Sequence, residues 1–280
     1  MVRIITDSAA DFEPVELEKL NIDCIPIKVL LGEREYEENI NLSKDQFFEL
    51  LASTGATPKT SQPSPQILID LFAETKKAGD EAIYITLSSA LSGTYQTAAM
   101  TCEDAESEAC HVFDSRNATG GQRLLVEYAV RLRDEGKTAK EILAALESVR
   151  DKIVLYACID TLEYLYRGGR ISQTVYKLGT MAQVKPIIRV SEEGGIEVPA
   201  KAMGMRKGMD QLCKRLEAQK PSADHKLYVM YTADRSIGRT LAQKIAALGY
   251  EVPEEQIIQV GAGIGSHIGP NACGIVYVAE

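Results

Sequence analysis

Short apolar runs alternate with amphipathic stretches along the first 150 residues. Apolar residues spaced three and four apart predict helices, over 14–20, 43–53, 65–79, 93–105, 120–136 and 138–152. Compact apolar runs between them are typical of buried strands, at 2–6, 22–31, 81–87 and 110–114. Strands that alternate with helices favour parallel pairing, so this part predicts a layered α/β domain.

A second unit begins at the apolar run "IVLYACID", residues 153–160. The pattern predicts a helix near 171–183, an extended pair over 185–201 with a Gly-Gly turn, and helices over 206–219 and 236–249. Further strands are expected at 226–233, 255–261 and 274–279. We therefore predict an N-terminal α/β domain over 1–152 and a C-terminal α/β domain over 153–280.

Composition and charge narrow the class of protein. No apolar run approaches the ~20 residues that span a bilayer, and the N-terminus has no secretion signal pattern, which predicts a cytoplasmic protein without stable membrane insertion. The six cysteines form no C-x-x-C pair, so reduced thiols are expected rather than a metal site or disulfides. Residues 1–150 hold 15 Lys/Arg against 26 Asp/Glu, which argues against nucleic acid as a partner.

The stretch "ITLSSALSGTYQTA", from Ile85 to Ala98, is rich in hydroxyls at a predicted strand-to-helix junction. Free backbone N–H groups of a helix start there attract anions, and Gly93 allows a ligand to approach. Ser92 could instead only cap the helix, although Tyr95 leaves a capping box incomplete. The pattern leaves a cap and an anion-binding role for Ser92, Gly93 and Thr94 equally open.

A second hydroxyl-rich loop, "KTSQPSP", spans Lys59–Pro65. Ser64 followed by Pro65 is typical of a helix N-cap and first helical position. Thr60 and Ser61 have no such local role. They could face the same sheet edge as Ser92 or belong to an ordinary turn.

A glycine-rich loop around one histidine is expected in "GAGIGSHIGPNACG", residues 261–274. It fails the dinucleotide pattern, because Ser266 and Ile268 stand where the third glycine is needed. Backbone access next to the glycines favours a site role for His267, with a tight connection as the alternative. The sequence "EGKTAKE" also fails as a phosphate loop, so no nucleotide site or cofactor is expected.

Two arginines, Arg167 and Arg170, flank a Gly-Gly pair in "EYLYRGGRIS". Guanidinium groups next to flexible backbone suit phosphate or carboxylate-rich partners. Basic residues at a helix C-terminus account for the pattern equally well.

Catalysis by serine is the enzyme alternative. A lipid hydrolase or acyltransferase could use Ser92 as nucleophile and His267 as base. The stretch "ALSGT" lacks the first glycine of G-x-S-x-G, which disfavours this reading, and we expect no catalytic residues and no metal.

Several stretches together resemble the DegV family of fatty-acid-binding proteins, which serve as acyl carriers for bacterial fatty acid kinase. The matching stretches follow the family order and span nearly the whole chain: "ITDSAADF", "KTSQPSP", "LSSALSGTYQTA", "DSRNATGGQ", "LEYLYRGGRIS" and "SHIGPNACG". The resemblance implies a three-layer α/β/α N-terminal domain with a parallel sheet. It also implies a two-layer C-terminal domain with a mixed sheet, and a long-chain fatty acid between the two.

The resemblance also implies roles for individual residues. Thr60 and Ser92 would bind the fatty acid carboxylate, with Ser61, Gly93 and Thr94 adjacent. Arg206 and His267 would form a network behind the carboxylate. Arg167 and Arg170 would lie on a surface that docks the catalytic subunit of the kinase, which makes the chain a carrier subunit rather than an enzyme.

Overall fold

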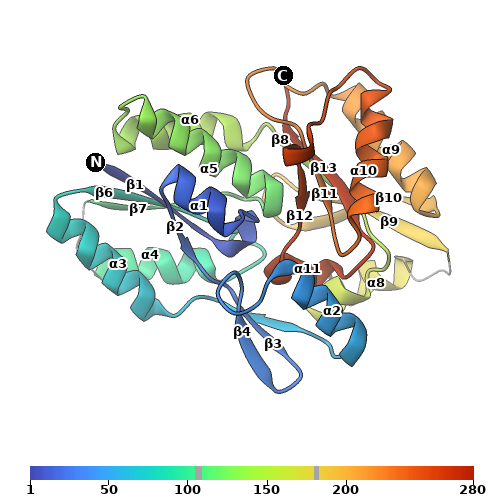
Figure 1. Ribbon diagram of the computed structural model, residues 1–280, viewed down its shortest axis with the longest axis horizontal. Helices are drawn as coiled ribbons and strands as arrows, with labels where there is room; N and C mark the ends of the chain where they lie inside the picture. Colours follow the sequence, from blue (N-terminus) through green and yellow to red (C-terminus); the bar gives the residue numbers. More distant parts are fainter. Residues whose placement is uncertain (105–108, 180–182) are drawn as a thin grey trace.

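A parallel four-stranded sheet forms the N-terminal half of the computed structural model, which describes residues 1–104, 109–179 and 183–280. Its strand order is β2 (Ile22–Ile25), β1 (Val2–Asp7), β6 (Glu81–Thr86) and β7 (Cys110–Asp114). Helices cover both faces (Figure 1): α1 (Pro14–Leu20), α5 (Thr119–Asp134) and α6 (Ala139–Arg150) lie on one, and α3 (Pro65–Ala78) and α4 (Thr94–Asp104) on the other. The predicted three-layer α/β/α arrangement is confirmed.

Local capping signals fix two of these helices where the sequence predicts them. The Ser64 hydroxyl accepts a hydrogen bond from Gln66 N–H, and Pro65 occupies the first helical position of α3. Thr138 and Glu141 complete a capping box at the start of α6. Both devices satisfy backbone N–H groups that a helix start leaves free.

The extended segment 22–31 divides into two strands that belong to different sheets. Pro26 has no N–H to donate to a ladder, and the chain leaves the parallel sheet there. Beyond it, a small antiparallel sheet has the order β4 (Arg34–Glu37), β3 (Lys28–Leu31) and β5 (Lys59–Ser61), next to α2 (Lys44–Thr54). The hydroxyl-rich loop predicted at Lys59–Pro65 therefore begins as a strand, in which Thr60 is opposite Val29.

A mixed six-stranded sheet forms the C-terminal half, as expected. Its order is β10 (Ile196–Met203), β9 (Val184–Val190), β8 (Ile153–Cys158), β13 (Cys273–Val278), β11 (Tyr228–Tyr231) and β12 (Ile257–Gln259). Strands β11 and β12 pair in parallel and the other neighbours pair antiparallel. The outer face is covered by α9 (Met205–Ala218) and α10 (Arg235–Ala246) (Figure 1). Helix α9 precedes β11 in the chain, and α10 precedes the single-turn helix η2 (Glu254–Gln256), which leads into β12.

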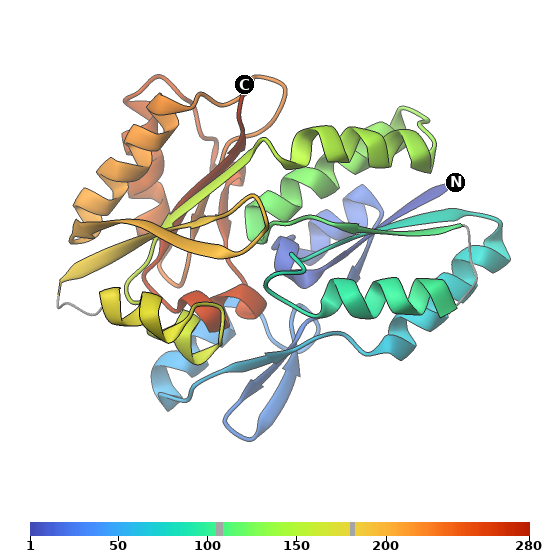
Figure 2. The ribbon, with the colours of Figure 1, turned by 180° about the vertical axis from the view of Figure 1, so that it is seen from behind.

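Three short helices lie in the connections between strands of this sheet. They are α7 (Glu163–Arg167) and α8 (Gln173–Gly179), between β8 and β9, and α11 (Ala262–Ile268), between β12 and β13. Residues 180–182 of the helix predicted near 171–183, and Ala105 at the end of the helix predicted over 93–105, lie outside the described residues. The hairpin of β9 and β10 reaches back toward the N-terminal half (Figure 2), where the Ser88 hydroxyl donates to Gly194 O at 2.9 Å. Within the described ranges, no helix combines the length and apolar character needed to cross a bilayer.

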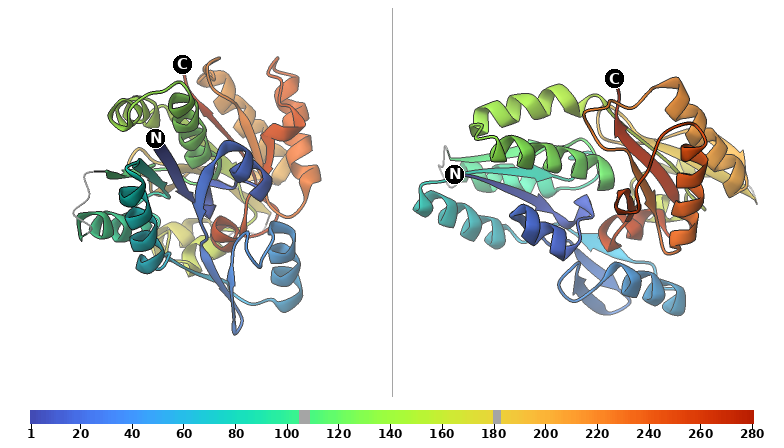
Figure 3. Two further views of the ribbon diagram at one scale, coloured as in Figure 1. Left: turned by 60° about the vertical axis from the view of Figure 1, so that its left-hand side comes forward. Right: turned by 45° about the horizontal axis from the view of Figure 1, so that its top comes forward.

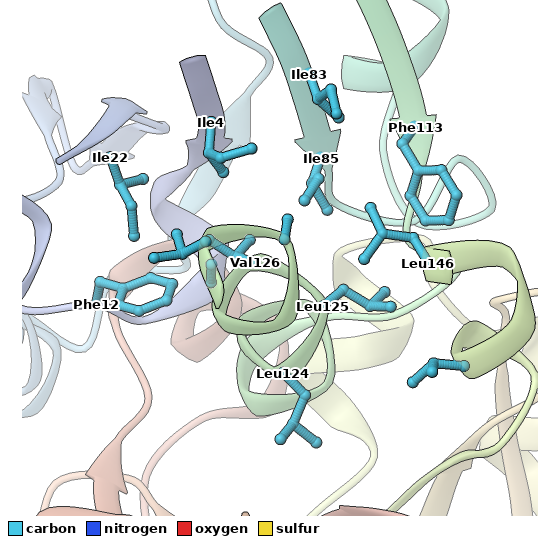
Figure 4. Packing of buried hydrophobic residues seen from close by; sticks show 14 of the residues in the cluster. Ile4, Phe12, Ile22, Ile83, Ile85, Phe113, Leu124, Leu125, Val126 and Leu146 are labelled. Atoms are coloured by element: carbon cyan, nitrogen blue, oxygen red, sulfur yellow. The ribbon is translucent and has the colours of Figure 1, made fainter. Parts of the chain in front are cut away.

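Helix α5 joins the two halves through one continuous core. On the face of α5 toward the parallel sheet, Leu125 and Val126 meet side chains of that sheet. Ile4, Ile85 and Phe113 point toward them (Figure 4). On its other side, the same apolar cluster continues into the C-terminal sheet through Leu155, Met230, Ile258, Val276 and Val278. Helix α5 is therefore buried between two sheets, and its first turn forms part of the junction where the candidate site lies.

Candidate ligand-binding site

A cavity of about 350 Å³ lies at the junction of the two halves. Its walls come from β5, the loop after β6, the turn after α7, the start of β10, and α11. Helix α11 lies next to α2 and α7 at the centre of the molecule (Figure 3). Segments far apart in the sequence therefore meet around a single space of the size typical for small-molecule sites.

One end of this cavity is polar. Its polar lining includes seven of the nine residues proposed for a site from the sequence: Thr60, Ser61, Ser92, Gly93, Thr94, Arg170 and His267. Ser61, Gln62 and Gly93 are exposed, so the polar end opens to solvent. A ligand could therefore place its polar group near the protein surface.

His267 pairs with Thr60 across this polar end, with 2.8 Å between His267 Nε2 and Thr60 Oγ1. Burial, followed by the positive charge of Arg170, lowers the pKa of His267 to about 4, so the ring is neutral at neutral pH. Its Nδ1 is buried and has no hydrogen-bond partner among the described residues; it faces Gly168, where an added Cβ would lie 2.1 Å away.

The unpartnered Nδ1 determines how the Thr60 hydroxyl is oriented. A buried N–H without an acceptor is rarer than a bare acceptor, so we assign the proton of His267 to Nε2. His267 then donates to Thr60 Oγ1. The hydroxyl proton of Thr60 remains free to donate into the cavity, toward an acceptor such as a carboxylate.

Ser92 lies at the start of α4 and also at the cavity wall. Its Oγ accepts from Thr94 N–H at 3.3 Å, at the first residue of α4, and lies 2.9 Å from Thr94 Oγ1. The same side chain lines the cavity. Gly93 has no room for a side chain without a shift, because a Cβ there would lie 2.3 Å from Gln62 Oε1.

The two arginines of the Gly-Gly turn have different environments. Arg170 is half-buried, lines the cavity, and donates from Nε to Leu91 O at 2.9 Å. Burial lowers its pKa. Arg167 is exposed, donates to Thr57 Oγ1 at 2.8 Å, and pairs with Glu163 on its own helix. Arg170 therefore lines the cavity while Arg167 lies on the surface, and the expectation that both dock a partner stays a prediction.

Arg206 does not lie behind the carboxylate site, contrary to the expectation. It is exposed in the first turn of α9 and does not line the cavity. Helix α9 packs on the outer face of the C-terminal sheet, so the sheet separates its buried side from α5 and the cavity. The motif located the start of the helix, but the layer to which the helix belongs depends on long-range packing.

Sequence reasoning missed Gln62 and the apolar walls of the cavity. Gln62 lies within the quoted "KTSQPSP" motif and could have been proposed from it. The apolar lining has no sequence signal that separates it from ordinary core residues; it comprises Ile27, Leu87, Leu91, Ala118, Leu165, Ile196, Ile264 and Ile268.

A second, smaller cavity of about 50 Å³ adjoins the first and is lined mainly by apolar residues. The two share Ala118, Ile196, Ile264 and Ile268 in their walls. The second cavity extends between the start of α5 and the C-terminal sheet as far as Met230. The combined space is therefore elongated, with one polar open end and one apolar buried end.

The geometry does not assemble a serine–histidine pair. The nearest hydroxyl partner of Ser92 Oγ is Thr94, and His267 Nε2 is paired with Thr60. A nucleophilic serine needs the histidine within hydrogen-bond reach. In the part of the chain that the structure describes, no group of three or more His, Cys, Asp or Glu residues could hold a metal ion.

Comparison with known proteins assigns the family. A family model described as an uncharacterised protein of the DegV family matches residues 1–280. The chain belongs to the DegV family. A DegV domain-containing protein of Caldanaerobacter subterraneus subsp. tengcongensis is 31% identical over 279 residues, which cover 99% of this chain and 98% of the relative.

Solved DegV structures share the fold over the full length. A DegV family protein from Thermus thermophilus, described for its fatty acid binding, has a TM-score of 0.89 and 29% identity, covering 100% of this chain and 99% of its own. DegV from Bacillus subtilis, described as a fatty acid binding protein, has a TM-score of 0.84 and 26% identity, with the same coverage. The architecture of two α/β halves is therefore that of DegV proteins.

Proposed function

We propose that this protein binds one long-chain fatty acid in the elongated cavity, with the carboxylate at the polar end. The observation that carries the proposal is the shape and polarity of the cavity. An apolar channel leads from a cluster of hydroxyl donors into the core beside α5. The DegV structures from Thermus thermophilus and Bacillus subtilis, described as fatty acid binding, support the same ligand class.

The expected binding energy of a fatty acid agrees with a cavity that has a long apolar part and one polar end. Burial of about fifteen methylenes contributes roughly 12 kcal/mol before the cost of binding, at ~0.8 kcal/mol for each CH₂. The hydrocarbon therefore supplies most of the affinity and needs only apolar walls. The carboxylate must still find donors, because a buried unpaired charge costs several kcal/mol.

Neutral hydroxyl donors suit a carboxylate that must react later. Thr60 has a free proton to donate, and the Ser92 hydroxyl lines the same end of the cavity. Gly93 and Thr94, at the start of α4, and Ser61 complete the immediate surroundings. Hydrogen bonds from hydroxyls satisfy the charge without a tight ion pair, so an oxygen remains accessible at the open end.

We further propose that the carboxylate is presented to a separate ATP-dependent fatty acid kinase in the cytoplasm, which converts it to an acyl phosphate. The chain would then be a lipid carrier and not itself an enzyme. The exposed Ser61, Gln62 and Gly93 leave the polar end accessible. The exposed Arg167, hydrogen-bonded to Thr57 close to β5, is the arginine that remains suitable for docking the kinase.

Native mass spectrometry of the purified protein tests the ligand. We expect an adduct with the mass of a long-chain fatty acid that dissociates under denaturing conditions. Delipidated protein should regain one adduct when stearate is added, and only one. Failure of the delipidated, folded protein to take up any of a series of fatty acids would contradict the proposal.

The carrier role needs a separate assay. Protein loaded with stearate should yield acyl phosphate only when a fatty acid kinase catalytic subunit and ATP are both added. Acyl phosphate formation by the chain alone, or none with a competent kinase from a DegV-containing bacterium, would argue against the carrier role while leaving fatty acid binding untouched.

A further inference from the structure

Two buried carboxylates hold the first turn of α11. Asp11 Oδ1 accepts from Gly261 N–H at 2.8 Å, and Glu38 Oε1 accepts from Gly263 N–H at 3.1 Å. Each of the two acids is only 1% exposed. Both come from the N-terminal half of the chain, so the helix that carries His267 is attached to the opposite half of the molecule.

The repeated glycines of α11 make this attachment possible. A Cβ at Gly261 would lie 2.1 Å from Glu38 Oε1, and one at Gly263 would lie 3.0 Å from Glu38 Oε2. A Cβ at Gly265 would lie 2.9 Å from the ring of Phe48. The stretch predicted as a glycine-rich loop is thus a helix, and its glycines let carboxylates and an aromatic ring approach the backbone closely.

The second oxygen of Glu38 reaches another wall of the cavity. Ser8 Oγ donates to Glu38 Oε2 at 2.6 Å and itself accepts from Ile27 N–H at 2.9 Å. Ile27 and Gly263 both line the cavity. One carboxylate therefore connects two walls of the ligand site without touching the ligand space.

We propose that Glu38 is a positioning residue for the carboxylate site, holding α11 so that His267 reaches Thr60. His267 follows Gly263 by four residues, so it lies one turn further along α11 on the same side. A displacement at the first turn is transmitted along the helix to the Thr60–His267 hydrogen bond. This inference rests on the proposed function, since the carboxylate of a fatty acid is the group that Thr60 would bind.

Only the ionised form of Glu38 accepts both of these hydrogen bonds. As a carboxylate, it accepts from both Ser8 Oγ and Gly263 N–H. A proton on Oε1 would break the hydrogen bond from Gly263 N–H, whereas a proton on Oε2 would reverse the other bond, so that Glu38 donates to Ser8 Oγ. Protonation therefore breaks or reverses one of the two hydrogen bonds and removes the charge that strengthens both.

Burial raises the pKa of Glu38 to about 7, and the negative charge of Asp11 adds to this effect. The hydrogen bonds from Ser8 and Gly263 and the positive charge of Lys44 act in the opposite direction. The titratable and charged groups around this carboxyl are Asp7, Asp11, Cys24 and Lys44, and on α11 itself His267. Glu38 therefore gains or loses its proton close to neutral pH.

Stability and ligand affinity then respond to pH in opposite directions. The folded protein retains this proton up to about pH 7, whereas an ordinary Glu releases it near 4.5. The Glu38 contribution to stability is therefore lost as pH rises between these values. Ligand affinity should instead increase as Glu38 ionises and fixes α11, a combination that a purely structural role does not produce.

The test compares Glu38→Gln with Glu33→Gln. Glutamine has nearly the shape of the protonated acid and cannot ionise, whereas Glu33 is an exposed residue of the β3–β4 turn. Delipidated proteins are titrated with stearate from about pH 8 to about pH 6, and urea unfolding is measured at both limits. The ionisation of stearate is common to all three proteins and cancels in the comparison.

We expect Glu38→Gln to bind stearate about tenfold more weakly than the parent at pH 8, as for the loss of a charged hydrogen bond. The difference should shrink toward pH 6, while the stability of the variant relative to the parent improves as pH rises. Glu33→Gln should match the parent throughout. The ¹⁵N resonances of His267 should shift in Glu38→Gln without any ligand and stay unchanged in Glu33→Gln.

Parent-like affinity and His267 resonances in a folded Glu38→Gln protein would overturn the inference. If that variant fails to fold, Ser8→Ala removes the same hydrogen bond from the other side, and parent-like resonances of His267 would then have the same meaning. Absence of stearate binding by the parent itself would refute the proposed function instead, while the ligand-free resonances would still report on Glu38.

Discussion

Replacement of Thr60 by valine tests the polar end of the cavity most directly. Valine keeps the volume and branching of threonine but removes the oxygen that lies 2.8 Å from His267 Nε2. Since Nδ1 of the same ring already has no partner, the variant leaves both nitrogens of His267 without one. The change therefore acts on the ligand-free protein as well as on the complex.

Two magnitudes follow from these contacts. In the ligand-free protein, a partly buried N–H that loses its acceptor costs about 1–3 kcal/mol of the free energy of unfolding. In the complex, the carboxylate loses one hydroxyl donor, and a hydrogen bond to a charged group contributes ~1.5–3 kcal/mol. That range corresponds to a loss of stearate affinity by about 10- to 150-fold.

Urea unfolding of the delipidated protein measures the first quantity, and titration with stearate measures the second. Thr54→Val is a matched control, because Thr54 is exposed and its hydroxyl contacts nearby backbone groups, donating to Leu50 O and accepting from Ala56 N–H. A Thr60→Val protein that unfolds like the parent and binds stearate with parent affinity would refute both the tautomer of His267 and the role of the hydroxyl.

Three further outcomes are expected. Ser92→Ala should weaken stearate binding by about 1–3 kcal/mol, and a fluorophosphonate probe should leave the parent unlabelled at Ser92; labelling would restore the hydrolase alternative. Met230→Ala should shift the preferred fatty acid toward longer chains in competition assays, because Met230 borders the apolar end of the cavity, whereas Met209→Ala, buried on the outer face of the sheet, should lower stability without that shift. Thr138→Ala should cost about 1 kcal/mol in urea unfolding by removing the α6 cap, with stearate binding unchanged.

Elements with local signals were predictable from the sequence. Helices α3 and α6 begin where Ser64–Pro65 and the Thr138–Glu141 box place them, because a cap depends on three or four adjacent residues. The stretch around His267, which the sequence predicts as a loop, is a helix. Its glycines disfavour a helix locally, but packing against Glu38 and Phe48 outweighs that preference.

The site itself was less accessible to pattern reasoning. Thr60 and His267 are separated by 207 positions, and only the family resemblance indicated that they belong to one network. Glu38 lies in the charged stretch "EREYEE", which has the composition of a surface turn, yet it is 1% exposed. The burial of Glu38 depends on α11, more than 200 residues later, and no local pattern reports it.

The position of α5 between the two sheets has a consequence for synthesis on the ribosome. When residues 1–152 have emerged, Leu124 and the adjacent apolar side of α5 have no C-terminal sheet to cover them. At ~5–20 residues per second, the remaining strands follow only after roughly ten seconds. The nascent first half must therefore remain soluble with an uncovered helix, and a gene divided at this boundary should yield fragments that aggregate when expressed separately and recover a fold only when produced together.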